Sequence, residues 1–411
     1  MSTDILSQPI VKVFHPTKKI HASILLPSSK SESNRVLIIN ALCEQPCQLT
    51  NLSEARDTQT MMRLLASTDL TLDVLDAGTT MRFLTAYCTV KNRETILTGT
   101  ARMCERPIQL LVDALRELGA AIEYTKNEGF PPIHIKNFTS KNNKLAIRGD
   151  VSSQYISALL MIAPTLPQGL ELELVGKVAS VPYIQMTLQL MENFGVKGKW
   201  GGNTISVKPQ KYHAATYMVE SDWSGSSYWY SVASLMHESE IKLLGLKKDS
   251  LQGDAAIVQI MEKLGVSTVF EADGVLLRKT KTEKTFEWDF THCPDLAQTV
   301  AVVCAAKGVE AKMTGLESLK IKETDRLIAV RDELAKFGIK AQDINDEILL
   351  IPSQEMQAPT AMVKTYKDHR MAMAFAPLGL LFSIEIEKPE VVEKSYPRFW
   401  EDLAKGGFEI S

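Results

Sequence analysis

The distribution of hydrophobic residues along the chain predicts a helical unit that recurs. In the segment 106–124, Ile108, Leu111, Leu115 and Leu118 recur at the spacing of one helix face, and a short apolar alternation follows. The same pattern recurs in segments 182–200, 253–270, 324–342 and 396–410, and more weakly in 57–75. Glycines stand where a helix C-cap favours a left-handed residue, at Gly119, Gly195, Gly265 and Gly338. The chain therefore divides into six similar units of about 70 residues.

Each unit also contains a second helix that is apolar on most faces. These helices are predicted over residues 35–42, 81–90, 155–164, 227–236, 296–306 and 370–382. Since helices that are apolar all round belong in an interior, each unit should have one buried helix, one half-exposed helix and strands around them. The polar junction at 218–226 separates three units from three, which favours a two-lobed molecule with a cleft between the lobes.

Composition excludes several classes of protein. The 411 residues are 45% hydrophobic, which excludes a disordered chain, and 46 Lys and Arg nearly balance 49 Asp and Glu. We therefore expect no nucleic acid and no membrane as a partner. Six cysteines form no C-x-x-C pair, the N-terminus lacks the apolar core of a signal peptide, and the most apolar stretch, 371–384, is interrupted by Pro377. These features predict a soluble, cytoplasmic protein.

Candidate chemistry gathers where the buried helices begin, because helix N-termini present unpaired N–H donors and attract anions. The candidates at the first three starts are Lys30, Ser31 and Arg35, then Asp76 and Gly78, then Ser152, Ser153 and Gln154, with Ser180 and Tyr183 following. A serine N-cap beside solvated cations is the competing interpretation of each motif taken alone.

The C-terminal half places carboxylates next to cations. The candidates there are Asp295, Lys322, Glu323, Arg326, Asp368, His369, Arg370 and Lys394. A carboxylate beside a lysine shifts proton affinities and permits general acid–base catalysis. The competing interpretation is a solvated helix start with an ion pair for KETDR, and an aspartate N-cap with two exposed neighbours for DHR.

Eight cations lie at or next to these helix starts: Lys30, Arg35, Arg82, Arg106, Lys322, Arg326, Arg370 and Lys394. Buried cations require counter-charges, so their convergence would demand anionic ligands. The sequence has no P-loop, no dinucleotide fingerprint and no H-E-x-x-H, and its seven histidines lack metal-ligand spacing. It therefore predicts an enzyme without metal or organic cofactor that acts on small, multiply anionic substrates.

Nine motifs in register resemble the 5-enolpyruvylshikimate-3-phosphate (EPSP) synthase family. They are PSSKSESNR, DAGTTMR, RMCERPI, VSSQ, SVPYI, LQGD, KETDR, DHRMAM and KSYP, between Pro27 and Pro397. The resemblance implies an α/β fold described as a two-lobed inside-out α/β barrel, with six βαβαββ-type repeats, three per lobe. Residues 29–220 would form the first lobe, which mainly binds shikimate 3-phosphate. Residues 1–28 and 221–411 would form the second, with the acid–base and phosphoenolpyruvate-binding residues.

The resemblance also implies a reaction, the transfer of the enolpyruvyl group of phosphoenolpyruvate to the 5-hydroxyl of shikimate 3-phosphate with release of phosphate, in a protein expected to be a monomer. The implied catalytic residues are Asp295, Glu323, Lys30, Lys322 and His369. Those implied for shikimate 3-phosphate are Lys30, Ser31, Arg35, Ser152, Ser153, Gln154, Ser180, Tyr183, Asp295, Ser318 and Lys322. Those implied for phosphoenolpyruvate are Lys30, Asp76, Gly78, Arg106, Gln154, Arg326, Arg370 and Lys394.

Several positions depart from the commonest pattern of that family: Ser28 for glycine, Asp76 for asparagine, Phe83 for proline, Cys104 for lysine and Ser318 for asparagine. Asp76 adds a carboxylate near an anion site, which weakens binding unless Arg82 or Lys30 neutralises it. Two alternatives stay open. One is the sister enolpyruvyl transferase that acts on UDP-N-acetylglucosamine, which uses a loop cysteine for which Cys104 is the candidate. The other is a non-catalytic anion-binding homologue.

Overall fold

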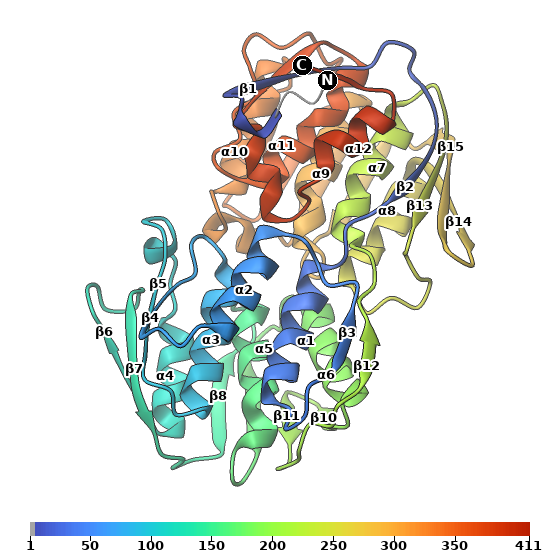
Figure 1. The fold of residues 1–411 in the computed structure, drawn as a ribbon. Coiled ribbons are helices and arrows are strands. Elements are labelled where there is room, and N and C mark those ends of the chain that lie inside the picture. The colour runs from blue at the N-terminus through green and yellow to red at the C-terminus, as the bar shows by residue number, and fades with distance from the viewer. Residues whose placement is uncertain (1–4) are drawn as a thin grey trace. The chain divides into compact units, whose positions relative to one another are not determined.

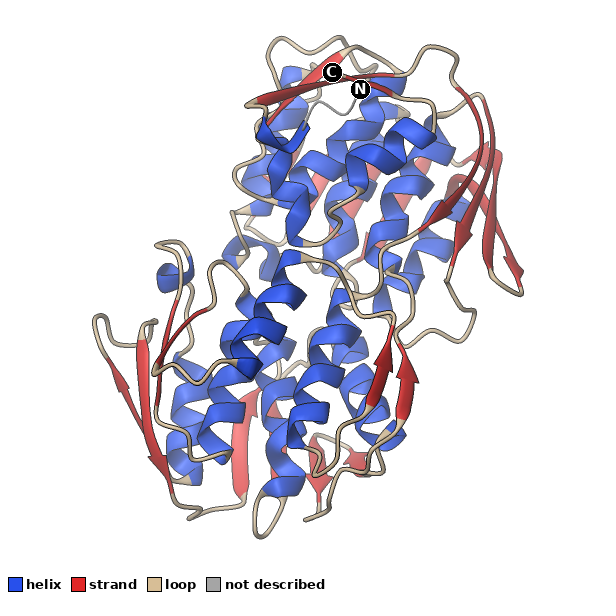
Figure 2. Ribbon diagram, viewed as in Figure 1, coloured by secondary structure: helices blue, strands red, loops and turns tan. Residues whose placement is uncertain are grey.

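The computed structural model describes residues 5–411 and shows a mixed α/β protein (Figure 1). The chain folds into two compact units, here called unit 1 (Met1–Pro27 and Glu220–Ser411) and unit 2 (Ser28–Val219). Within each unit the helices lie side by side and the strands lie at their periphery (Figure 2). In the described part of the chain, no helix is long and apolar enough to cross a membrane.

Unit 2 contains six α-helices: α1 (Lys30–Leu42), α2 (Arg56–Ala66), α3 (Gly78–Val90), α4 (Gln109–Leu118), α5 (Ser153–Ile162) and α6 (Val181–Asn193). Its strands are β3 (Gln48–Thr50), β4 (Thr71–Asp73), β5 (Thr95–Thr98), β6 (Ala120–Tyr124), β7 (Ile133–Phe138), β8 (Lys144–Arg148), β9 (Leu170–Val175), β10 (Gly198–Gly201), β11 (Thr204–Val207) and β12 (Thr216–Met218). Two short 3-10 helices, η2 (Met103–Glu105) and η3 (Ala163–Thr165), interrupt its loops.

Unit 1 contains α7 (Trp223–Leu235), α8 (Ile257–Lys263), α9 (Ala297–Ala306), α10 (Arg326–Lys336), α11 (His369–Phe375) and α12 (Phe399–Lys405). Its strands are β1 (Ile10–Phe14), β2 (Lys19–Leu25), β13 (Glu238–Leu244), β14 (Leu264–Glu271), β15 (Gly274–Thr282), β16 (Thr285–Asp289), β17 (Glu310–Thr314), β18 (Gln342–Ile344), β19 (Ile348–Ile351), β20 (Ile384–Glu387) and β21 (Glu409–Ile410). Its 3-10 helices are η1 (Ile5–Ser7), η4 (Gly253–Ala256), η5 (Pro294–Leu296), η6 (Glu317–Ile321), η7 (Ala376–Leu380) and η8 (Pro389–Lys394).

Four sheets share one topology. In the sheet β4-β5-β7-β6, β4 and β5 are parallel and joined through α3, and the antiparallel hairpin β6–β7 follows α4. The orders β8-β9-β11-β10, β2-β13-β15-β14 and β16-β17-β19-β18 repeat this βαβαββ arrangement. β2 and β13 are far apart in the sequence, because unit 2 lies between them in the chain, but they still pair in parallel.

Two further repeats are reduced versions of the same plan. β12 pairs in parallel with β3, and no hairpin joins that sheet among residues 5–411. In the other, a single parallel bridge between Val363 and Ile386 takes the place of the first strand, and β1 lies between β20 and β21. The prediction of an α/β fold with six repeats, three in each unit, is therefore confirmed. In the described chain the sheets remain open and none closes into a barrel, so "inside-out" describes helices inside and sheets outside.

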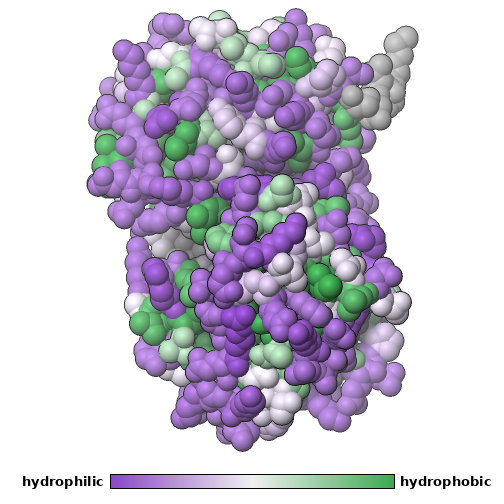
Figure 3. Space-filling model, turned by 90° about the vertical axis from the view of Figure 1, so that its left-hand side faces the viewer, coloured by the Kyte–Doolittle hydropathy of each residue, from purple (hydrophilic) through white to green (hydrophobic). Residues whose placement is uncertain are grey.

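The predicted buried helices form the core of each unit. In α9 every residue from Ala297 to Ala305 is buried, and α5 and α7 are buried over nearly their whole length. Burying one large aliphatic or aromatic side chain stabilises a fold by about 1.5–3 kcal/mol, so the apolar side chains of these buried helices supply much of the driving force. On the face shown in Figure 3, hydrophilic residues predominate and hydrophobic ones occur in small groups.

Helix ends follow the glycine and proline signals of the sequence. Gly119, Gly195, Gly265 and Gly338 all adopt positive φ, from 79° to 115°, as the C-cap prediction requires. The predicted helix 370–382 is wrong in its second half, because α11 ends at Phe375 and continues as the 3-10 helix η7. Pro377 lacks the N–H that an α-helical bond there would use, which accounts for the change.

Candidate active site

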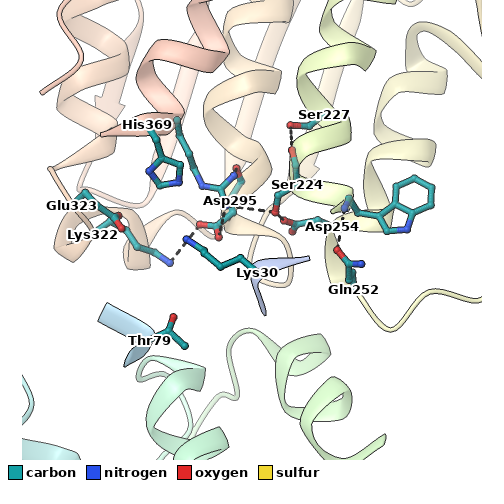
Figure 4. A network of polar contacts seen from close by, with 12 residues as sticks. Lys30, Thr79, Ser224, Ser227, Gln252, Asp254, Asp295, Lys322, Glu323 and His369 are labelled. Carbon is teal, nitrogen blue, oxygen red and sulfur yellow. Dashed lines mark hydrogen bonds and ion pairs between the residues drawn. The ribbon is translucent and has the colours of Figure 1, made fainter. Parts of the chain in front are cut away.

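In unit 1, charged side chains converge at the starts of α9, α10 and α11 (Figure 4). Asp295 lies in η5 immediately before α9, and Arg326 is the first residue of α10. Asp368 is the N-cap of α11, where its carboxylate accepts a hydrogen bond of 2.9 Å from the backbone N–H of Arg370. Helix capping therefore fixes the backbone from which the charged side chains project.

Arg326 is the centre of this cluster. Its guanidinium donates to Asp295 Oδ1 and to Glu323 Oε2, both at 2.9 Å, and to Asp368 Oδ2 at 2.7 Å. The side chain is only 2% exposed, so KETDR is not a solvated helix start. Burial opposes its charge, yet the carboxylates of Asp368, Glu323 and Asp295 raise the pKa of Arg326 above its usual value. This arginine stays charged and orients three carboxylates.

Arg370 and Lys322 approach the same aspartate. Arg370 Nη2 lies 2.9 Å from Asp295 Oδ2, and Lys322 Nζ lies 3.5 Å from Asp295 Oδ1. Burial works against ionisation of Asp295, but Arg370, Lys322 and Arg326 together hold its pKa well below the usual range. Burial lowers the pKa of Lys322, although Asp295 counteracts that effect. Three cations hold Asp295 ionised. An anion that enters the cluster can take these cations as its own partners in place of Asp295.

Two further predicted residues complete this cluster. Lys394, at the end of η8, places Nζ 3.8 Å from Glu323 Oε1 and is buried. His369 is buried, and its Nδ1 lies 3.5 Å from Asp368 Oδ1. Asp368 therefore is the predicted N-cap, but its neighbours His369 and Arg370 are buried rather than exposed. Ser318 lies in η6, half-buried, four residues before Lys322.

In unit 2, the first predicted motif begins α1. Ser29 is the N-cap and accepts from the N–H of Glu32 at 3.4 Å, while Lys30 forms an ion pair of 3.1 Å with the buried Asp57. Lys30 remains 18% exposed, so its ammonium reaches solvent beside the start of the helix. Ser31 lies next to it and its carbonyl accepts from Arg35 at 2.9 Å. The motif combines the predicted cap with a partly buried cation.

Arg35 is buried and held by hydroxyl groups. It donates to Thr187 Oγ1 at 2.7 Å and to Ser157 Oγ at 3.0 Å, and its guanidinium lies 5.9 Å from the ring centre of Tyr183. Burial lowers the pKa of Arg35 to about 10, so the group is still charged at neutral pH. Its direct partners among these contacts are neutral, which suits it to an anionic ligand.

Gly78 and Arg106 lie against each other. A Cβ atom built on Gly78, the first residue of α3, would lie 2.6 Å from Arg106 Nη1. Arg82 donates to the Gly78 carbonyl at 3.2 Å and to the Pro107 carbonyl at 2.9 Å, which ties the loop of Arg106 to the start of α3. A glycine at position 78 leaves the guanidinium in this place, because the guanidinium occupies the space of a side chain.

The other predicted residues of unit 2 lie at the same helix starts. Gln154 Nε2 donates to Thr79 Oγ1 at 3.0 Å, which joins the first turns of α5 and α3. Ser152 is the N-cap of α5 and accepts from the N–H of Gln154 at 3.4 Å, and Ser153 is buried beside it. Ser180 precedes α6 with a left-handed φ of 52°, and Tyr183 lies in the first turn of that helix.

Sequence reasoning missed several partners. Asp76 pairs with Arg56 of α2, at 3.1 Å and 3.2 Å, where Arg82 or Lys30 had been expected as the neutralising residue. Asp57 was not expected beside Lys30, nor Asp254 and Ser224 beside Arg370. In residues 5–411 no group of three or more His, Cys, Asp and Glu side chains has the geometry of a metal site.

Comparison with known proteins decides the family. The model for EPSP synthase (3-phosphoshikimate 1-carboxyvinyltransferase) matches residues 14–69 and 64–403. A curated 3-phosphoshikimate 1-carboxyvinyltransferase from Bacteroides fragilis is 49% identical over 396 residues, which cover 95% of this chain and 97% of the relative. The chain belongs to the EPSP synthase family. Its relative of the same name from Sulfurovum sp. is 36% identical over 419 residues, with 94% of this chain and 97% of the relative covered.

Solved structures agree on the fold of the family. An EPSP synthase structure from Acinetobacter baumannii superposes with a TM-score of 0.77 and covers 98% of this chain and 100% of that one. The sequence identity in that comparison is 20%, so the likeness concerns the fold. The EPSP synthase resemblance seen in the nine motifs is thus confirmed by the family model and by the curated relatives.

Proposed function

We propose that this EPSP synthase family member is a 3-phosphoshikimate 1-carboxyvinyltransferase. It transfers the enolpyruvyl group of phosphoenolpyruvate to the 5-hydroxyl of shikimate 3-phosphate and releases phosphate, a step in aromatic amino acid biosynthesis by way of chorismate. Family membership supports the reaction class. The observation that carries the chemistry is the cluster around Arg326, where Asp295 and Glu323 are held beside Lys322 and Lys394.

Shikimate 3-phosphate would be held mainly by hydroxyl groups and by cationic side chains. Its proposed ligands are Lys30, Ser31, Arg35, Ser152, Ser153, Gln154, Ser180 and Tyr183 of unit 2, with Asp295, Ser318 and Lys322 of unit 1. Arg35, whose side-chain hydrogen-bond partners are neutral hydroxyl groups, supports this assignment because an incoming phosphate would add a direct counter-charge to that of Glu32.

Phosphoenolpyruvate would be held mainly by guanidinium and ammonium groups. Its proposed ligands are Lys30, Gly78, Arg106 and Gln154 of unit 2, with Arg326, Arg370 and Lys394 of unit 1; Asp76 is proposed as a site residue beside them whose charge must be neutralised. The close approach of Arg106 to Gly78 leaves the guanidinium beside the backbone at the start of α3, where a carboxylate or phosphate is favoured.

We assign the two proton transfers to Asp295 and to Glu323, the latter in its protonated form. Asp295 accepts the proton of the 5-hydroxyl as its oxygen attacks C2 of phosphoenolpyruvate, while Glu323 protonates the C3 methylene to give a tetrahedral adduct. Glu323 then removes a proton from C3 as the C2–O bond to phosphate breaks and the enol ether forms. Lys30 and Lys322 would stabilise charge on the oxygens that change bonding, and His369, whose Nδ1 lies 3.5 Å from Asp368 Oδ1, is the fifth proposed catalytic residue.

Substrate binding would also prepare the base. Asp295 is a weak base while Arg326, Arg370 and Lys322 all face it. An anionic substrate that engages these cations withdraws part of their field from Asp295 and raises its pKa toward the range useful for proton transfer. Asp295 would therefore become a better base only when the substrates are bound.

The two alternatives have less support. Cys104 is half-buried, and its thiol lies 3.6 Å from the Gly99 carbonyl, on the loop next to Arg106. The family model and the relatives favour the shikimate substrate over a UDP-sugar, and the paired Asp295 and Glu323 argue against a non-catalytic homologue. We also propose a cytoplasmic monomer that uses no cofactor and binds neither nucleic acid nor membrane.

A titration tests the function directly. Shikimate 3-phosphate is added to the purified protein in a calorimeter, phosphoenolpyruvate follows, and phosphate release is measured in parallel. We expect binding of the first, binding of the second in its presence, and one phosphate per product. Turnover with UDP-N-acetylglucosamine instead, or binding of both anions without release of phosphate, would refute the proposal in favour of one or the other alternative.

A further inference from the structure

Asp254 is a buried carboxylate at the edge of the Arg370 cluster for which the mechanism above gives no role. It lies in η4, within the motif LQGD, and is 2% exposed. Oδ2 accepts a hydrogen bond from Ser224 Oγ, and Oδ1 has no hydrogen-bond partner among residues 5–411. A buried carboxylate with half of its acceptors unused is unfavourable for the fold, so its presence calls for a reason.

Ser224 connects this carboxylate to Arg370. Arg370 Nη2 lies 3.5 Å from Ser224 Oγ and 2.9 Å from Asp295 Oδ2, and Arg370 Nη1 lies 3.4 Å from the hydroxyl of Tyr228. Ser224 and Tyr228 are four residues apart in α7, so both contacts to the guanidinium come from one face of its first turns. Since a guanidinium only donates, Ser224 must accept from Arg370, which leaves its own proton for Asp254.

The loop that carries Asp254 is fixed to α7 independently. Gln252 Oε1 accepts from the N–H of Trp223 at 2.9 Å, and its Nε2 donates to the Ser221 carbonyl at 2.8 Å. Asp254 caps neither η4 nor α8, whose N-caps are Gln252 and Ala256. The carboxylate is therefore held toward Ser224 by the loop and has no role in starting its own helix.

We propose that Asp254 and Ser224 are positioning residues that fix the guanidinium of Arg370 through the chain Arg370, Ser224, Asp254. The kinetic part of this inference rests on the proposed function, in which Arg370 binds phosphoenolpyruvate. Asp295 and Ser224 both contact Nη2 of Arg370, and Asp254 orients the Ser224 hydroxyl so that its oxygen accepts from this nitrogen. The guanidinium then stays in one orientation when a substrate draws on Asp295.

Kinetics of four variants test the role. Ser224→Ala and Asp254→Ala should each raise the KM for phosphoenolpyruvate roughly tenfold, as expected for loss of a hydrogen bond involving a charged group, with the dissociation constant of shikimate 3-phosphate unchanged. Asp254→Asn, whose amide oxygen still accepts from Ser224, should recover part of the loss. Ser227→Ala is the matched control, because that hydroxyl of the same helix contacts the Ser224 carbonyl and Thr299 instead. Equal effects of Ser224→Ala and Ser227→Ala would overturn the proposal.

A measurement without substrate separates this inference from the proposed function. In protein labelled with ¹⁵N-arginine, the Arg370 side-chain signal, assigned by its loss in Arg370→Lys, should report hindered rotation of the guanidinium. Ser224→Ala and Asp254→Ala should speed that rotation, and Ser227→Ala should not. Unchanged rotation in both variants overturns the positioning role even if the enzyme is active. A wild-type protein that is inactive with both substrates refutes the function, while the rotation rates still decide the role of Asp254.

Discussion

The guanidinium of Arg106 occupies the space that a side chain at position 78 would need, since a Cβ on Gly78 would lie 2.6 Å from Nη1 and 3.0 Å from Cζ. The clash is with the far end of a flexible side chain, so the guanidinium can move while the backbone of α3 stays. Close packing thus makes Gly78 a determinant of where Arg106 points, a role distinct from any backbone contact with a ligand.

Gly78→Ala is therefore expected to displace Arg106 without unfolding the protein. We expect the KM for phosphoenolpyruvate to rise roughly tenfold, similar to the effect of Arg106→Ala, because one charge-assisted contact is lost in both. The thermal midpoint should change little. Gly201→Ala is the control, because a Cβ there meets nothing within 4 Å. A KM that is unaltered in Gly78→Ala would show that Arg106 does not contact this substrate.

Glu323→Gln tests the proton transfer at C3. Glutamine keeps the size of the side chain and can still accept from Arg326, but it neither donates nor removes the required proton. Turnover should fall by roughly 10² to 10⁴, with little change in the binding of shikimate 3-phosphate by calorimetry. Glu317→Gln, at an exposed position of η6, should leave turnover unaffected. Full activity of Glu323→Gln in the phosphate-release assay would remove this residue from its assigned role.

The elements that could be predicted are those that depend on local pattern. The buried helices and the glycines at 119 and 338 follow from residues a few positions apart, and the structure confirms them. The predicted helix 370–382 passes over Pro377 and is wrong there, because a proline cannot continue the hydrogen-bond ladder of an α-helix. The six-fold recurrence strengthened these predictions, since each copy supports the others.

The partners of the charged residues could not be predicted in the same way. Asp76 and Arg56 are 20 residues apart, and Asp254 and Ser224 are 30 apart. Their contacts arise from how α2 packs near α3, and how η4 packs near α7, which no periodicity of the sequence encodes. Arg56 of the preceding helix pairs with Asp76, and nothing in the sequence pattern marks it as a partner in addition to Arg82 or Lys30.

The pair of Arg56 and Asp76 leads to a third prediction. Arg56→Ala leaves the Asp76 carboxylate less neutralised, two residues before Gly78, and should raise the KM for phosphoenolpyruvate. The pair is about one-third exposed, 37% and 30%, so the effect should be small, roughly two- to fivefold. The double variant Arg56→Ala with Asp76→Asn should return the KM toward that of the wild type. If adding Asp76→Asn does not lower the KM again, Arg56 affects the binding of phosphoenolpyruvate by something other than its charge.

Asp254 should also make the free energy of unfolding depend on pH. Burial, followed by the charge of Asp295, raises the pKa of Asp254 from about 3.8 to about 7, while Arg370 and Ser224 lower it and Asp222 raises it further. The Cys293 thiol also interacts with this carboxylate. The folded protein therefore binds more protons than the unfolded chain between these two values. By linkage, the free energy of unfolding contributed by Asp254 falls as the pH rises from about 4 to about 7 and is constant above.

Asp254→Asn removes this titration, because the amide is neutral at every pH. The free energy of unfolding of the variant minus that of the wild type should therefore increase between pH 5 and pH 8, as measured by urea denaturation at both values. Asp295, whose pKa is held well below the usual range, loses its stabilising effect only as the pH falls through that lower value, so its titration lies outside this window. If the difference in the free energy of unfolding is the same at pH 5 and pH 8, Asp254 is ionised at both values. Arg370, acting through Ser224, would then stabilise the charged carboxylate more than its raised pKa implies.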